Sequence, residues 1–97
     1  MTLTQIELTK IQTFFADKPV KKIYLFGSYA RGEATESSDV DLLIDWDYSK
    51  HIGLNYGVWL EEIQEVLKKD VDFVSVEYIS PLIEKYVNED KKLIYEA

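Results

Sequence analysis

The sequence contains no cysteine and a single histidine, His51. Without cysteine the chain has no disulfide, no thiolate nucleophile and no cysteine metal ligand. One histidine also excludes a histidine-rich metal cage, and we expect His51 to be a loop residue rather than a catalyst. No apolar run approaches the roughly 18–20 residues that cross a bilayer, and the N-terminus lacks the pattern of a signal peptide. These absences predict a cytoplasmic protein that does not bind membranes.

The rest of the composition predicts one folded domain over residues 1–97. A chain of this length buries roughly 60–70% of its unfolded surface, which is enough for one modest core. Its content of 46% hydrophobic and 30% charged residues is typical of a globular protein and not of a disordered one.

Negative charge is concentrated in one segment of the chain. There are 18 acidic and 11 basic residues, for a formal net charge of −7. Between Gly32 and Asp47 there are six carboxylates and no lysine or arginine, so the remainder has 12 acids against 11 bases. A metal, a basic partner or a solvated loop would explain such a surplus. The overall acidity argues against direct binding of nucleic acid, whose backbone attracts clustered lysine and arginine.

Hydrophobic periodicity and turn signals predict the element order α-β-β-α-β-α. A Thr4–Glu7 capping box begins the first helix, and Ser80-Pro81 begins the last as N-cap and first-turn proline. The expected elements are a helix over the first 16 residues, a strand over 21–26, a polar turn or short helix over 28–36, a strand over 39–46, a helix over 55–69, a strand over 71–76, a helix from 81 through 87 and a short edge strand over 92–95. This order predicts an α/β or α+β fold with a small mixed sheet flanked by helices.

The strand over 39–46 alternates between apolar and polar positions. Its two faces are Val40, Leu42 and Ile44 on one side and Asp39, Asp41, Leu43 and Asp45 on the other. This alternation predicts a half-buried strand. Asp39 and Asp41 share a face, so they repel each other unless a cation joins them. Their oxygen ligands suit Mg²⁺, which takes one or two carboxylates plus substrate phosphates.

Chain topology is expected to bring Gly27-Ser28 and Asp72 to this carboxylate pair. Only ten residues separate Ser28 from Asp39, fewer than the dozen or so that a parallel crossover needs, so the first two strands are predicted to be antiparallel. The end of the first strand then lies beside the start of the second. The helix over 55–69 is long enough for a parallel crossover that places Asp72 next to the pair. Three carboxylates and a phosphate-sized gap are therefore expected at one sheet edge.

These residue types suit phosphoryl or nucleotidyl transfer. Gly27 lets a phosphate approach the backbone, and the Ser28 hydroxyl and nearby amides donate to phosphate oxygens. Arg31 neutralises phosphate charge with its fork of donors. Asp39, Asp41 and Asp72 are expected to hold two metal ions that clamp an in-line displacement. Asp72 is also expected to accept the proton of the attacking hydroxyl.

One stretch of the chain resembles the signature of the nucleotidyltransferase superfamily that includes DNA polymerase beta. It runs over 27–44 as Gly-Ser-Tyr-Ala-Arg-Gly-Glu-Ala-Thr-Glu-Ser-Ser-Asp-Val-Asp-Leu-Leu-Ile. This stretch and the small size resemble the minimal nucleotidyltransferase (MNT) branch, which implies the nucleotidyltransferase fold. The resemblance implies that Gly27-Ser28 is the phosphate-binding pair and that Asp39 and Asp41 are the metal-binding pair. It implies that Asp72 is the third carboxylate, with Mg²⁺ as cofactor and ATP as substrate.

The MNT resemblance also implies a partner. MNT proteins are typically antitoxins paired with a HEPN-domain protein, a small helical RNase toxin. A metal-dependent transfer of AMP from ATP to a tyrosine hydroxyl of that toxin is therefore implied. Neutralisation by binding alone, and transfer to a small molecule or an RNA end, are the open alternatives, although the absence of a further substrate domain favours a protein acceptor. The carboxylates without an assigned role are candidates for partner docking: Glu33, Glu36, Asp45 and Asp47.

Overall fold

A computed structural model describes residues 1–50 and 52–97, so the predicted loop position of His51 lies outside the described residues. The elements are α1 (Gln5–Phe15), β1 (Val20–Phe26), α2 (Ser28–Arg31), β2 (Val40–Trp46), α3 (Asn55–Leu67), β3 (Val71–Ser75), a 3-10 helix η1 (Val76–Tyr78), α4 (Pro81–Asp90) and β4 (Lys92–Glu96). The predicted order of helices and strands is confirmed. Among the helices of the described ranges, none has the length and apolar content to cross a membrane.

The four strands form one mixed sheet in the order β3-β2-β1-β4. β1 pairs antiparallel with β2 along one edge and with β4 along the other. β2 and β3 are parallel, and α3 forms the crossover between them. Both predicted strand orientations are confirmed. The end of β1 consequently lies beside the start of β2, and the start of β3 lies on the far side of β2.

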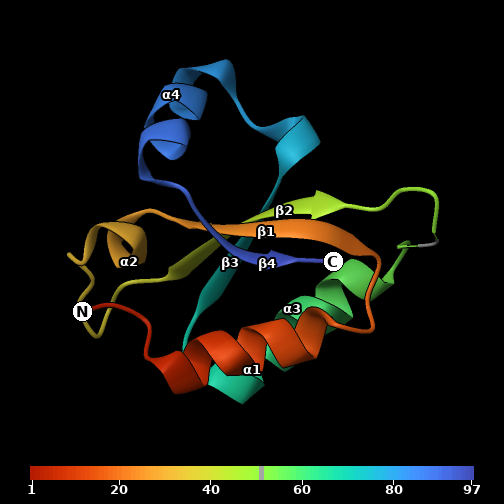
Figure 1. The fold of residues 1–97 in the computed structure, drawn as a ribbon, viewed down its shortest axis with the longest axis horizontal. Helices are drawn as coiled ribbons and strands as arrows, with labels where there is room; N and C mark the ends of the chain where they lie inside the picture. The colour runs from red at the N-terminus through yellow and green to blue at the C-terminus, as the bar shows by residue number, and fades with distance from the viewer. Residues whose placement is uncertain (51) are drawn as a thin grey trace.

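The main core lies between the sheet and the layer formed by α1 and α3 (Figure 1). The inward-facing residues of β2 are at most 2% exposed: Val40, Leu42, Ile44 and Trp46. Trp46 stacks on Trp59 of α3, with ring centroids 5.8 Å apart. At the start of α1 both halves of the Thr4–Glu7 capping box form, as predicted.

The opposite face of the sheet carries α4 (Figure 1). Asp41, Leu43 and Asp45 are the residues of β2 that alternate onto this face. Leu43 is only 4% exposed, so β2 is more deeply buried than the half-buried strand that its alternation predicts. α4 packs lightly, because Val87 is its one buried residue.

Several element ends differ from the predicted ranges by a few residues, and three of the differences follow a change of backbone direction. α2 is a single turn over Ser28–Arg31, capped by Gly32 in the left-handed region (φ 76°). α3 stops at Leu67 because Lys68 adopts a left-handed conformation (φ 56°). β3 ends at Ser75, where the chain turns into η1, instead of continuing to Val76. Each difference is a local change of backbone direction that leaves the sheet order unchanged.

Candidate functional site

The turn after β1 requires glycine. Gly27 has φ 74° and ψ −156°, a conformation that residues with a side chain rarely adopt. A Cβ placed on it would lie 3.2 Å from Asp41 Cγ and nearer still to Oδ2. The Gly27 carbonyl accepts hydrogen bonds from the amides of Ala30 (3.0 Å) and Arg31 (3.1 Å), which begin the turn of α2 that opens with Ser28. The Asp41 carboxylate therefore requires glycine at this position, and the approach of a phosphate to the Gly27 backbone stays a prediction.

Asp41 lies where three strands meet. In the strand register it pairs with Phe26, the residue before Gly27, on one side and with Asp72 of β3 on the other. Asp41 is half-buried, whereas Asp72 and Asp39 are exposed. The topology thus brings the glycine turn and the carboxylates together at one edge of the sheet.

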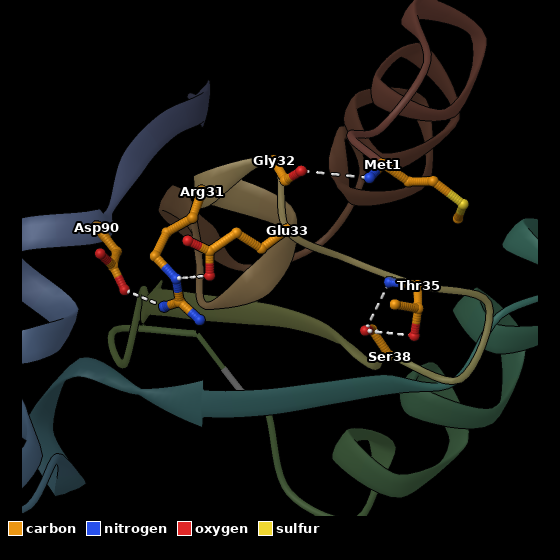
Figure 2. Close-up of polar contacts among 7 residues, drawn as sticks. All are labelled: Met1, Arg31, Gly32, Glu33, Thr35, Ser38 and Asp90. Atoms are coloured by element: carbon orange, nitrogen blue, oxygen red, sulfur yellow. Dashed lines mark hydrogen bonds and ion pairs between the residues drawn. The ribbon is translucent and has the colours of Figure 1, made fainter.

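The connection from α2 to β2 ends in a tight turn closed by Ser38. The Thr35 amide donates to Ser38 Oγ (2.9 Å) (Figure 2), and the Ser38 amide donates to the Thr35 carbonyl (3.0 Å). Directly after this turn, the Val40 amide donates to the carbonyl of Asp70 (2.9 Å). Asp39 is held between these two sets of bonds, so its backbone is fixed although its side chain is exposed.

Asp41 has an unfavourable electrostatic environment. Burial, with the charges of Asp72 and Asp39, raises the pKa of Asp41 to about 6, while the charge of Arg31 lowers it. A carboxylate that is costly to ionise beside two others is more typical of a functional site than of an ordinary surface. A cation shared between these carboxylates would remove the free-energy cost of ionising Asp41.

The donor set suits Mg²⁺ without forming a complete cage. In residues 1–50 and 52–97, no three His, Asp or Glu side chains are grouped closely enough to hold a metal ion. Mg²⁺ is commonly held by one or two carboxylates together with substrate phosphates, so a full set of protein ligands is not required. Asp41 and Asp72 supply two carboxylates from paired strands, and Asp39 adds a third nearby. The residues therefore fit a metal ion that binds together with a nucleotide.

Arg31, the predicted phosphate ligand, contacts two carboxylates. Its Nε donates to Glu33 Oε2 (3.0 Å), and its Nη1 donates to Asp90 Oδ2 (2.6 Å) (Figure 2). Glu33, a carboxylate to which the sequence assigns no role, thus pairs with Arg31 while its side chain stays 66% exposed. No feature of the sequence indicates the pairing with Asp90, because the two residues are 59 positions apart and meet only through the packing of α4.

The other acids of the 32–47 segment lie outside this arrangement. Glu36 is exposed in the loop before β2. Asp45 alternates onto the same face as Asp41 but lies toward the other end of β2, opposite Lys22. The Ser49 hydroxyl (2.6 Å) and amide (3.1 Å) donate to Asp47 Oδ1 and hold the pKa of Asp47 below its usual value. Asp47 therefore stabilises a local turn.

The fold and the site define a class of protein. The family model described as "Polymerase beta, Nucleotidyltransferase" matches residues 9–97, and the chain belongs to this family of enzymes. The resemblance found in the 27–44 stretch is thereby confirmed. Within the family, the chain is 38% identical over 99 residues to a Methanocaldococcus jannaschii protein that is named as a protein adenylyltransferase, and the match covers 97% of each chain.

Two solved toxin–antitoxin structures contain the same fold. A chain in a complex with AMP-PNP has a TM-score of 0.77 at 24% identity, covering 93% of this chain and 73% of that chain. A chain in the complex of a tri-AMPylated Shewanella oneidensis HEPN toxin with its MNT antitoxin has a TM-score of 0.73 at 22% identity, covering 98% and 74%. At these identities the likeness concerns the fold alone.

Proposed function

We propose that this nucleotidyltransferase is a Mg²⁺-dependent protein adenylyltransferase, which moves AMP from ATP to a tyrosine hydroxyl of a HEPN-type toxin and so acts as an antitoxin. The observation that carries the proposal is the juxtaposition of Gly27, Asp41 and Asp72 at one edge of the sheet. The name of the M. jannaschii relative supports a protein acceptor. The AMPylated HEPN toxin in the S. oneidensis complex supports the kind of partner.

In the proposed reaction the acceptor oxygen attacks the α-phosphorus of ATP. The new O–P bond forms as the bond from the α-phosphorus to its β-bridging oxygen breaks, and pyrophosphate leaves. Asp72 accepts the hydroxyl proton. The Ser28 hydroxyl and the amides that follow Gly27 donate to phosphate oxygens. Asp39 and Asp41 are the side chains that would hold Mg²⁺, which would neutralise the phosphate charge of an in-line displacement.

The direct test is a transfer assay with ATP labelled at either the α- or the γ-phosphate. The purified chain is incubated with MgCl₂ and a candidate HEPN-type protein. We expect the α-label to appear on the partner, the γ-label to stay off it, and EDTA to abolish the α-label. Transfer of the γ-label would indicate phosphorylation and contradict the proposal. Labelling that persists in EDTA would contradict the metal requirement.

Exposed apolar side chains on α4 also favour a protein as the acceptor. Leu82 and Tyr86, one helical turn apart on this helix, are 84% and 65% exposed. We call these two residues the α4 surface. Because Arg31 of α2 is paired with Asp90 of α4, this surface belongs to an element that reaches the nucleotide end of the sheet. Groups of exposed apolar residues commonly mark protein interaction sites.

A double substitution, Leu82→Asp with Tyr86→Ser, is expected to slow AMP transfer to the partner about tenfold or more. Removing apolar anchors from an interface weakens association, whereas neither residue belongs to the nucleotide site. Initial rates against partner concentration should show the loss, and calorimetric titration with an ATP analogue should show unchanged binding. Ile6→Asp is the matched control, because Ile6 is 70% exposed on α1 across the sheet. Equal loss in the control, or no loss in the double variant, would contradict a role of the α4 surface.

Neutralisation by binding alone is favoured by one observation. Glu33 and Glu36 expose their carboxylates in the loop between α2 and β2. Such a loop complements a basic, RNA-binding surface on an RNase. If binding alone is sufficient, a variant that cannot transfer AMP will still protect cells from the toxin.

A further inference from the structure

The last residue of α4 contacts the arginine that follows the glycine turn. Asp90 Oδ2 lies 2.6 Å from Arg31 Nη1, and Figure 2 shows the two side chains reaching toward each other from α4 and α2. The Asp90 side chain is 18% exposed and that of Arg31 is 42% exposed. A short pair with one largely buried partner is a stronger constraint than a pair on the open surface.

The second partner of Arg31 constrains it less. Glu33 is two residues away on the same turn, and its side chain is 66% exposed. Solvent screens such a pair, and the long side chains retain much of their freedom. Asp90 is therefore the residue that sets the direction of the guanidinium. Within the described part of the chain, the Arg31 guanidinium donates hydrogen bonds through Nε and Nη1, and Nη2 donates none.

We infer that Asp90 is a positioning residue for the nucleotide, because it holds Arg31 with Nη2 directed to donate to a phosphate oxygen of ATP. The inference rests on the proposed function for its ligand. The Arg31 amide donates to the Gly27 carbonyl (3.1 Å), and Gly27 lies against the Asp41 carboxylate, so Arg31 belongs to the turn next to the carboxylate site. Asp90 does not contact the nucleotide itself, so all of its effect passes through Arg31.

Loss of the Asp90 carboxylate has two effects on the affinity for ATP, and they have opposite signs. ATP is an anion, so removal of a nearby negative charge would by itself strengthen ATP binding. Loss of the constraint on Arg31 would weaken it, because an arginine that must be ordered on binding contributes less to affinity. The sign of the change in affinity therefore separates a positioning role from a simple electrostatic one.

The test is calorimetric titration of the full chain with the α,β-methylene analogue of ATP and MgCl₂. Asp90→Asn is expected to raise the Kd about tenfold, as for loss of one well-placed charged hydrogen bond. In an Arg31→Ala background the same substitution is expected to change the Kd less than about twofold, because its effect requires the arginine. Unchanged or tighter binding by Asp90→Asn would overturn the inference, as would equal weakening in both backgrounds.

Glu7→Gln provides a matched control for stability. Glu7 pairs with Lys69 at 2.8 Å and is 15% exposed, so this pair resembles the Asp90 pair in length and burial. Glutamine also preserves the capping box. We expect Glu7→Gln to lower the thermal unfolding midpoint as Asp90→Asn does, while leaving the Kd unchanged. Because the titration needs no acceptor protein, it stays informative if the transfer assay fails, and a positive transfer assay cannot rescue a negative titration.

Discussion

Replacing Asp41 by asparagine is expected to abolish AMP transfer and, at the same time, to make the metal-free protein more stable at neutral pH. The transfer rate should fall about 1000-fold or more, because the site loses a carboxylate that we propose as a ligand for Mg²⁺. Asparagine has nearly the same shape but carries no charge. It therefore removes the ionisation that burial and the neighbouring Asp72 and Asp39 oppose.

The expected gain in stability depends on pH in a defined way. An aspartate titrates near pH 3.9 in an unfolded chain, whereas the pKa of Asp41 in the folded protein is about 6. Its charge therefore opposes folding fully above about pH 7, and this penalty shrinks as the pH falls and disappears by about pH 3, where the carboxyl is protonated in both states. Two pKa units correspond to at most about 3 kcal/mol, and solvent screening of a half-buried group reduces the expected gain to about 1 kcal/mol.

Denaturant unfolding in EDTA measures this gain, and the α-label assay measures the loss of transfer. The Asp41→Asn protein should be the more stable one at pH 7 and equal to the unmodified protein at about pH 3. Asp45→Asn is the control, since Asp45 is half-buried on the same face of the same strand, four residues further on; it should keep its transfer activity. Transfer that survives in Asp41→Asn would disprove the carboxylate assignment. Full protection of cells by an inactive variant would favour neutralisation by binding.

Gly27→Ala is expected to impair both transfer and folding. The Gly27 backbone has φ 74°, and an added Cβ would collide with the Asp41 carboxylate. Strain of this kind costs about 2 kcal/mol, and relief requires displacement of either the turn or the carboxylate. Transfer should consequently fall about 100-fold, because a shift of about 1 Å in a reacting geometry has that order of effect. Thermal denaturation and the α-label assay measure the two losses.

Gly57→Ala is the matched control for this substitution. Gly57 lies in α3, and nothing lies within 4 Å of the Cβ that would be added there. Alanine should therefore stabilise the protein by about 0.5–1 kcal/mol through its higher helix propensity, with transfer unchanged. If Gly27→Ala is as stable and active as the unmodified protein, the turn does not need glycine, and the role assigned to Gly27 in the site is wrong.

The sheet could be predicted because it follows from local patterns and two connection lengths. The ten-residue connection from Ser28 to Asp39 is too short for a parallel crossover, and the helix before Asp72 is long enough for one. These two facts order the first three strands and bring the carboxylates to one edge. Most residues of the candidate site could therefore be predicted from the sequence.

Features that depend on how elements pack could not be predicted. Alternation places Asp39 and Asp41 on one face but does not show that Asp41 alone is enclosed between two neighbouring strands. Leu43 is buried on the face that its polar neighbours suggest is open. The contact of Asp90 with Arg31 follows from the position of α4, an element with one buried residue and hence a weak packing signal in the sequence.

The pairing of β4 with β1 has a consequence for how the chain is made. Lys22 of β1 pairs with Glu96 of β4, so about 70 residues must be synthesised before this edge of β1 is covered. Until then its unpaired amides and carbonyls offer a template for strands of other molecules, and Lys21 and Lys22 are the kind of charged residue that limits such pairing. A chain truncated before Lys92 is therefore prone to aggregate along β1, the strand that leads into the Gly27 turn.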